Sequence, residues 1–156
     1  MGEVCIRSAA NFLGYWKNEQ ATKDAFTDDM YFRTGDLGYL DPEDYLFIVD
    51  RKKDIIIRGG ENISCIEVED AIYAHADIAE CSVFGLPDER FVEVPAAVIL
   101  TKEGRESVTP AALRDFLLTN TAPFKVPLEE HIFVVHETLP RLGTQKVDKK
   151  TLREQY

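Results

Sequence analysis

Three short segments of this chain carry side chains that could bind an anionic ligand with free hydroxyl groups. In the first segment, Asp36 follows Gly35 in a predicted tight turn, from which its carboxylate could accept hydrogen bonds from a pair of ligand hydroxyls. The same spacing suits an Asx-type turn, in which the carboxylate bonds its own backbone. Spacing alone favours the Asx-type turn.

The second segment joins a charged run, Asp50–Asp54, to the glycine pair Gly59 and Gly60. Because Arg51 and Lys53 stand between two apolar strands, the run is a candidate joint between two bodies. The glycines would allow a ligand or a partner to approach the backbone closely. A solvated hairpin with a glycine-rich turn explains the same residues, and both interpretations remain open at this point.

The third segment, Leu139–Lys150, contains a loop marked by Pro140 and Gly143. Lys146 lies near the predicted tip of this loop, just before a helix, where its ammonium group could move onto an anion as a compact charge. Most lysines in loops are merely solvated, and the spacing does not separate the two cases.

Charge and cysteine content narrow the class of protein. The 156 residues include 18 basic and 28 acidic side chains, and the net charge of −10 argues against DNA or RNA as a partner. Half of the basic residues fall within 51–58 and 141–153, which suggests a local site for a small anion such as a nucleotide phosphate. The three cysteines lack metal-ligand spacing, so no metal site is predicted. Without a membrane-spanning run or a signal peptide, the predicted location is the cytoplasm.

The first fifty residues are predicted to form an incomplete β-rich piece. Its elements carry little apolar mass, and such pieces bury too little surface to offset the chain entropy lost on folding. Turns are expected at Gly35, Gly38 and Asp41–Pro42. The expected elements are a strand over Glu3–Arg7, a helix over Gln20–Phe26, and strands over Tyr31–Arg33 and Tyr45–Val49.

Residues 51–156 have the pattern of a fuller α+β domain, in which helices cover a small mixed sheet. Ser64 stands three residues before Glu67, which is the spacing of a capping box. Thr109–Pro110 places a cap and an N1 proline at the start of a second helix. The expected strands are Asp54–Ile57, Glu80–Phe84, Val94–Thr101 and Ile132–Val135, followed by a short basic helix from about Asp148.

Taken together, in this order and spacing, the three segments resemble the adenylate-forming superfamily of acyl-CoA synthetases, peptide-synthetase adenylation domains and firefly-type luciferases. The resemblance rests on the Arg-Thr-Gly-Asp run that ends at Asp36, on Asp50–Ser64 and on the lysine loop, and it covers almost the whole chain. Asp50–Ser64 is most similar to the acyl-CoA synthetase branch. The resemblance implies an AMP-forming ligase that uses ATP with Mg²⁺, activates a carboxylic acid such as a fatty acid as an acyl-adenylate, and transfers it to coenzyme A.

Matching positions carry the family's residue roles onto this chain. Asp36 would hold the ribose hydroxyls of the nucleotide, and Arg51 would support the same ribose. Lys146 would be the catalytic lysine of adenylate formation, because its ammonium group would bridge carboxylate and phosphate oxygens in the transition state. Lys53 would be the hinge about which a small lid domain rotates between the two steps, bringing Gly59–Gly60 to the coenzyme A channel.

The sequence departs from the family pattern at three positions. Gln145 stands before the lysine where glycine is usual, Val92 replaces a common glycine, and Ser8 replaces another. The first departure bears most on function, because a side chain at position 145 could restrict the loop that delivers Lys146.

The resemblance also implies a partner domain. Because neither a phosphate-binding loop nor an acyl pocket is found, we expect residues 1–50 to be the end of a large N-terminal domain and residues 51–156 to be the mobile C-terminal lid. The chain alone is expected to be inactive, to bind no ligand tightly, and to expose strand edges in 1–50 that could pair or swap between copies. The alternatives are a peptide-synthetase fragment that serves a carrier protein, and a stand-alone binding module derived from the lid.

Overall fold

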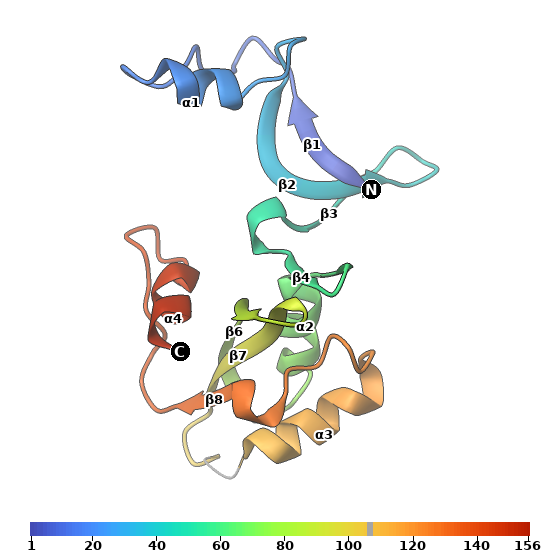
Figure 1. Cartoon of the computed structure of the whole chain (residues 1–156), viewed down its shortest axis with the longest axis vertical. Helices are drawn as coiled ribbons and strands as arrows, with labels where there is room; N and C mark the ends of the chain where they lie inside the picture. Colours follow the sequence, from blue (N-terminus) through green and yellow to red (C-terminus); the bar gives the residue numbers. More distant parts are fainter. Residues whose placement is uncertain (106–107) are drawn as a thin grey trace. The chain divides into compact units, whose positions relative to one another are not determined.

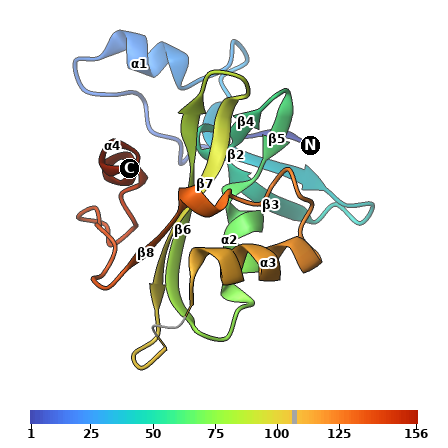
Figure 2. The same cartoon turned by 60° about the horizontal axis from the view of Figure 1, so that its bottom comes forward.

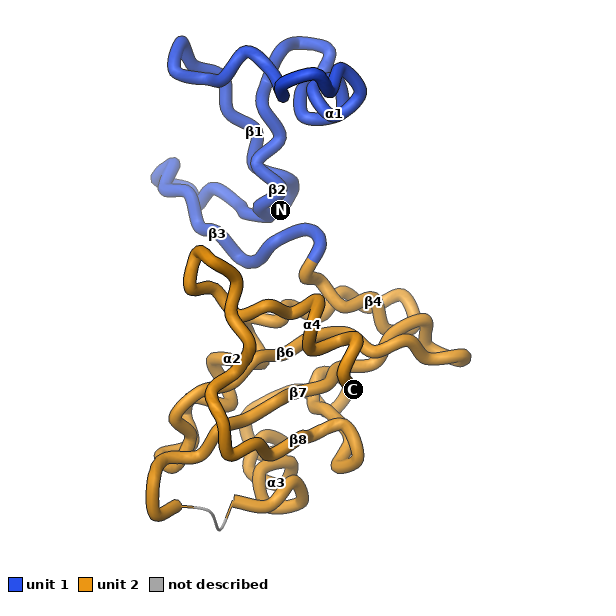
Figure 3. The backbone as a smooth tube through the Cα atoms, turned by 90° about the vertical axis from the view of Figure 1, so that its left-hand side faces the viewer, with its two compact units in different colours: residues 1–53 blue, residues 54–156 orange. Residues whose placement is uncertain are grey.

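A computed structural model describes residues 1–105 and 108–156 of the chain. These residues separate into two compact units, unit 1 (residues 1–53) and unit 2 (residues 54–156), which Figure 3 shows in different colours. The sequence prediction placed the border between residues 50 and 51. Within the described ranges, no helix has the length and apolar character that crossing a bilayer requires.

Unit 1 is built on a three-stranded antiparallel sheet in the order β1-β2-β3, counted over the described residues. The rings of Phe12, Phe26 and Phe32 pack together with centroids 5.2 to 5.7 Å apart. Asn18 caps helix α1 by accepting a hydrogen bond from the N–H of Ala21. The elements, labelled in Figure 1, are β1 (Gly2–Ile6), α1 (Glu19–Asp24), β2 (Phe32–Leu40) and β3 (Leu46–Arg51).

The predicted turns at Gly35 and Gly38 are wrong, because strand β2 continues through both residues. Gly35 has a φ of +75° and lies where the register against β1 shifts, as in a β-bulge. At Gly38 a Cβ atom would lie only 2.6 Å from the Phe47 carbonyl oxygen. Glycine therefore marks a bulge and a close approach of two strands here, which the sequence could not distinguish from turns. The turn at Asp41–Pro42 is confirmed.

Unit 2 confirms the α+β prediction, with a five-stranded mixed sheet among the described residues. Strand β7 pairs antiparallel with β6 along its whole length, parallel with β8, and antiparallel with β4. The strands are β4 (Ile56–Arg58), β5 (Glu61–Ile63), β6 (Ile78–Asp88), β7 (Val92–Thr101) and β8 (Ile132–Val135), with a short 3₁₀ turn at Glu129–His131. The helices are α2 (Cys65–Tyr73), α3 (Pro110–Asn120) and α4 (Lys149–Gln155).

Helices cover both faces of this sheet, as Figure 2 shows. Helices α2 and α3 pack on one face, where Val68 and Leu113 belong to the larger buried cluster. Helix α4 packs on the other face through Leu152. Both predicted helix caps are confirmed, because the side chains of Ser64 and Thr109 accept hydrogen bonds from backbone N–H groups three residues later, each at 3.2 Å.

Candidate functional site

Asp36 and Arg51 face each other across strands β2 and β3. They are register partners, and Arg51 Nε lies 2.9 Å from Asp36 Oδ1. The Arg51 guanidinium also donates to the Thr34 carbonyl oxygen at 3.3 Å. Asp36 therefore lies in a strand, and the prediction of a tight turn at this residue is wrong. Its side chain is 32% exposed, so a ligand could still reach the carboxylate.

Lys53 is the last residue of unit 1 and lies in a 3₁₀ turn, Lys52–Asp54. The preceding Lys52 pairs with Glu3 at 3.1 Å, and this hydrogen bond lowers the pKa of the Glu3 carboxyl. Lys53 itself is exposed and has no ion pair with any described residue. Rotation of the backbone at this position would break no salt bridge of the Lys53 side chain.

Gly59 and Gly60 form the turn of a hairpin between β4 and β5, which confirms the hairpin interpretation. Their φ angles of +57° and +92° lie in the region that favours glycine. The Gly59 N–H donates to the Phe91 carbonyl oxygen at 2.8 Å, which ties the hairpin to the turn between β6 and β7. Strand β5 was not predicted, and β4 begins later than expected because Lys52–Asp54 form the 3₁₀ turn.

Lys146 lies in a hydrogen-bonded loop, residues 141–147, that an isolated bridge between Arg141 and Val147 closes. Within the loop, the Leu142 N–H donates to the Lys146 carbonyl oxygen at 2.8 Å, and the Gln145 N–H donates to the Leu142 carbonyl oxygen at 2.9 Å. The Lys146 side chain is exposed. The loop thus holds the backbone of Lys146 while its ammonium group faces solvent.

The other basic side chains of the stretch 141–153 all have carboxylate partners in unit 2. The pairs are Arg141–Glu80, Lys149–Glu69 at 2.9 Å, Lys150–Glu154 at 3.7 Å and Arg153–Asp54 at 3.9 Å. Within the part of the chain that the structure describes, Lys146 is the one cation of this stretch without a carboxylate partner. Its charge is therefore available to an external anion.

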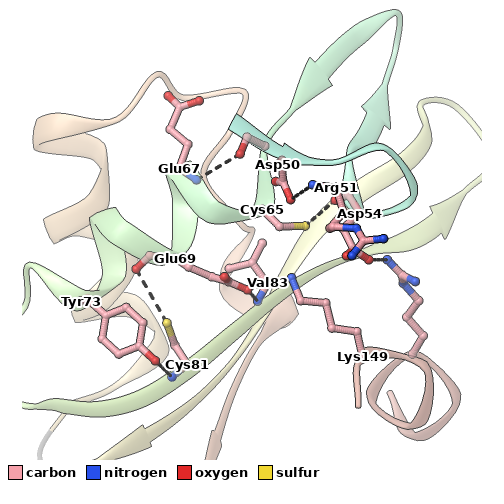
Figure 4. A network of polar contacts seen from close by, with 12 residues as sticks. Asp50, Arg51, Asp54, Cys65, Glu67, Glu69, Tyr73, Cys81, Val83 and Lys149 are labelled. Atoms are coloured by element: carbon pink, nitrogen blue, oxygen red, sulfur yellow. Dashed lines mark hydrogen bonds and ion pairs between the residues drawn. The ribbon is translucent and has the colours of Figure 1, made fainter. Parts of the chain in front are cut away.

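Figure 4 shows a polar network around Glu69 of helix α2 that the sequence analysis missed. Glu69 Oε1 accepts hydrogen bonds from the Val83 N–H at 2.8 Å and from the Lys149 ammonium group at 2.9 Å. Burial favours the neutral form of Lys149, but Cys65 and the Glu69 carboxylate outweigh it and raise the pKa of Lys149. Lys149 therefore stays cationic and joins α4 to α2.

The same helix also covers the edge of the sheet. Tyr73 lies one turn after Glu69, and its hydroxyl oxygen accepts a hydrogen bond from the Cys81 N–H at 3.2 Å. Glu69 and Tyr73 thus satisfy N–H groups on alternate residues of β6, an edge strand of the described sheet. Burial raises the pKa of the Cys81 thiol to about 12, so this cysteine is not a nucleophile at neutral pH. Two polar residues four apart on α2 were the only sequence signal for this contact.

Two of the departures from the family pattern coincide with left-handed backbone conformations. Gln145 has a φ of +67° and Val92 has a φ of +73°. Glycine adopts this region without steric cost, whereas other residues do not. The structure therefore explains why glycine would suit both positions.

Comparisons with known proteins point to one family. Residues 67–146 match the model described as the AMP-binding enzyme C-terminal domain. The chain is 42% identical over 155 residues to a long-chain-fatty-acid–CoA ligase of Mycobacterium tuberculosis, covering 99% of this chain and 30% of the ligase. It is 41% identical over 157 residues to an oxalate–CoA ligase of Saccharomyces cerevisiae, covering 100% of this chain and 28% of that protein. The chain thus spans less than a third of the length of these relatives.

Solved structures agree with these relatives. ATP-bound MatB from Rhodopseudomonas palustris matches with a TM-score of 0.90 and 35% identity, over 99% of this chain and 30% of that chain. The o-succinylbenzoate CoA synthetase of Bacillus subtilis, in complex with its acyl-adenylate intermediate, matches with a TM-score of 0.86 and 34% identity, over 97% of this chain and 30% of that chain. Both similarities cover almost all of this chain.

Proposed function

Because this chain belongs to the AMP-binding enzyme C-terminal domain family, we propose that it is the C-terminal part of an ATP-dependent, AMP-forming acid–thiol ligase. The relatives described above are named as CoA ligases, which supports coenzyme A rather than a carrier protein as the acyl acceptor. Their names include a long-chain fatty acid and oxalate, so the proposed substrate class is a carboxylic acid, such as a fatty acid, with no chain length specified. The proposed location is the cytoplasm, which suits three free cysteines.

The observation that carries this proposal is the unpaired cation at Lys146. In the proposed first step, a substrate carboxylate attacks the α-phosphate of ATP, pyrophosphate leaves, and an acyl-adenylate forms. Negative charge gathers on the carboxylate and phosphate oxygens in the transition state, where a pre-positioned ammonium group is most stabilising. Within the described residues, Lys146 has no carboxylate partner to compete with this role.

The remaining residues have roles in ligand binding and in the change between the two steps. Asp36 would accept hydrogen bonds from the ribose hydroxyls, with its carboxylate oriented by Arg51 at 2.9 Å. In the proposed second step the coenzyme A thiol attacks the acyl-adenylate, and AMP leaves. Lys53 would be the hinge that withdraws Lys146 before this step, and Gly59–Gly60 would line the pantetheine channel.

A large nucleotide-binding domain is the proposed partner of unit 1. Leu13 and Trp16 are 100% and 88% exposed, and this domain could cover both side chains. In residues 1–105 and 108–156, no group of three or more His, Cys, Asp or Glu side chains could hold a metal ion. The Mg²⁺ of the proposed reaction would be bound together with the phosphates of ATP.

The test separates the two half-reactions in the complete protein that contains this chain. Lys146→Ala should slow carboxylate-dependent ATP–pyrophosphate exchange by about 10²–10³-fold, judged by the loss of comparable oxyanion-stabilising donors. The transfer of a supplied acyl-adenylate to coenzyme A should be nearly unchanged. Lys150→Ala is the matched control, because its side chain is 84% exposed and pairs only at the surface. If Lys146→Ala catalysed ATP–pyrophosphate exchange at the wild-type rate, the proposed function would be refuted.

A further inference from the structure

The loop that carries Lys146 is tied to the sheet through Arg141. Arg141 Nη1 donates to the Gln145 carbonyl oxygen at 2.7 Å, and Arg141 Nη2 donates to the Glu80 carboxylate. The two bonds use different nitrogen atoms of one planar guanidinium group, so both can form at once. Arg141 therefore bridges strand β6 and the peptide bond directly before Lys146.

The carbonyl group that Arg141 binds belongs to a residue in an unfavourable conformation. Gln145 has a φ of +67°, where the Cβ atom of an L-residue is crowded. Such conformations persist when surrounding contacts hold them. Because the Gln145 carbonyl is part of the peptide bond to Lys146, a bond to this oxygen restricts the direction in which the Lys146 side chain leaves the loop.

The other end of this bridge lies in the sheet. Glu80 lies in β6 opposite Leu100 of β7, within the longest strand pair of the described sheet. The Glu80 side chain is only 15% exposed, whereas that of Arg141 is 40% exposed. Glu80 thus connects the loop to the sheet. The ion pair between Lys149 and Glu69 holds α4, the helix that follows the loop.

We propose that Arg141, held by Glu80, is a positioning residue that binds the Gln145 carbonyl and so aims Lys146 at its anion. This inference rests on the proposed role of Lys146 in adenylate formation. Arg141 does not touch the reacting atoms, so its effect should be confined to the step that uses Lys146. Small displacements of a catalytic group are costly, and a shift of about 1 Å can slow a reaction about 10²-fold.

The experiment compares variants in the complete protein, with the two half-reactions measured separately. Arg141→Met should slow ATP–pyrophosphate exchange by about 10-fold to 100-fold and leave transfer from a supplied acyl-adenylate unchanged. Relative to Arg141→Met, Arg141→Lys should recover part of the rate, because an ammonium group can still donate to the Gln145 carbonyl oxygen but lacks the planar fork with which arginine binds this oxygen and Glu80 together. Lys150→Met is the control on the neighbouring helix and should match the wild type.

A charge exchange distinguishes positioning from simple stabilisation. The double variant Glu80→Arg/Arg141→Glu restores an ion pair but leaves a carboxylate beside the Gln145 carbonyl. The melting temperature should recover while ATP–pyrophosphate exchange stays slow. A wild-type rate of ATP–pyrophosphate exchange in Arg141→Met would overturn the proposal. So would an equal loss of rate in both half-reactions, or a recovered rate of ATP–pyrophosphate exchange in the double variant.

Amide hydrogen exchange keeps this test separate from that of the proposed function. The Leu142 N–H donates to the Lys146 carbonyl oxygen, so it should exchange faster in Arg141→Met than in Lys150→Met. If Lys146→Ala has a normal first step, the proposed function fails, and the catalytic purpose of Arg141 fails with it. Unchanged exchange of the Leu142 amide would instead overturn the restraint of the loop by Arg141, whatever Lys146 does.

Discussion

Replacing Glu69 by leucine should destabilise unit 2 more than any surface substitution. Glu69 Oε1 accepts from the Val83 N–H at 2.8 Å and from Lys149 at 2.9 Å, and the two charged side chains are only 19% and 20% exposed. Glu69→Leu would leave a largely buried cation without its anion and would leave a backbone N–H without an acceptor. An unpaired buried charge and an unsatisfied backbone N–H group both destabilise folded proteins strongly.

The expected cost follows from these contacts. Breaking a fully buried ion pair costs about 3–5 kcal/mol, and the partial exposure of this pair reduces the expected loss to about 2–4 kcal/mol. Lys149→Met alone should cost about 1–2 kcal/mol, because Glu69 keeps its bond to Val83. The double variant should also cost only about 1–2 kcal/mol, since the Val83 N–H is then the one group left unpaired. The two changes are therefore expected to be non-additive by about 3 kcal/mol.

Urea unfolding with two probes measures this coupling. Trp16 is 88% exposed in the folded chain, so its fluorescence would change little on unfolding, and amide hydrogen exchange of β1, β2 and β3 is the probe of unit 1. Far-UV circular dichroism reports mainly on α2, α3 and α4 of unit 2, and only this transition should move in Glu69→Leu. Lys150→Met, which removes an exposed pair, should change stability by less than about 0.5 kcal/mol. Additive single variants, or a loss below about 0.5 kcal/mol in Glu69→Leu, would refute the reasoning.

The pH dependence of the same variants gives an independent check. The pKa of Lys149 is raised in the folded chain, so the native state holds this proton more tightly than the unfolded state does. The stabilisation is fully present below the ordinary lysine pKa of about 10.4 and is lost as the pH rises through the raised value. Wild-type stability should therefore fall more steeply at alkaline pH than that of Lys149→Met. Parallel curves for the two proteins would contradict this.

Two further predictions concern backbone geometry. Gly38→Ala should destabilise unit 1 by about 1–3 kcal/mol, because the new Cβ would lie 2.6 Å from the Phe47 carbonyl oxygen. Faster amide hydrogen exchange in β2 and β3 is the expected readout, and unchanged rates would show that the strands can separate at no cost. Val92→Gly should stabilise unit 2 by roughly 0.5–1 kcal/mol in the dichroism transition, because the relief of a left-handed conformation exceeds the entropy cost of glycine. Gln145→Gly should have the same sign, and a loss of stability in either variant would contradict this explanation.

The elements that sequence rules predicted well depend on residues that are close in the sequence. The caps at Ser64 and Thr109 are bonds between a side chain and an N–H three residues later, so the sequence alone contains both partners. Strand β8 and helix α4 also lie where their patterns placed them. The family resemblance extended this to the whole domain, because the order and spacing of three segments are properties of the sequence.

The elements that the sequence misjudged depend on what lies across the sheet. Gly35 and Gly38 were assigned to turns because glycine permits both a turn and a close approach of strands, and only the pairing of β2 with its neighbours decides which occurs. Strand β5 was missed because its three residues, Glu61–Ile63, are too few to show an alternating pattern. Asp36 was assigned to a turn because it follows Gly35, and only the pairing of β2 with β3 shows that it lies in a strand.

The sequence by itself determined the fold class, the family and the presence of a cluster of lysines near the end of the chain. It could not determine which lysine is free. Lys149 pairs with Glu69, and Arg141 pairs with a carboxylate 61 residues away, whereas Lys146 has no such partner among the described residues. Only the tertiary structure brings distant charges together. An ammonium group is available to a ligand when no carboxylate of the folded chain already forms an ion pair with it.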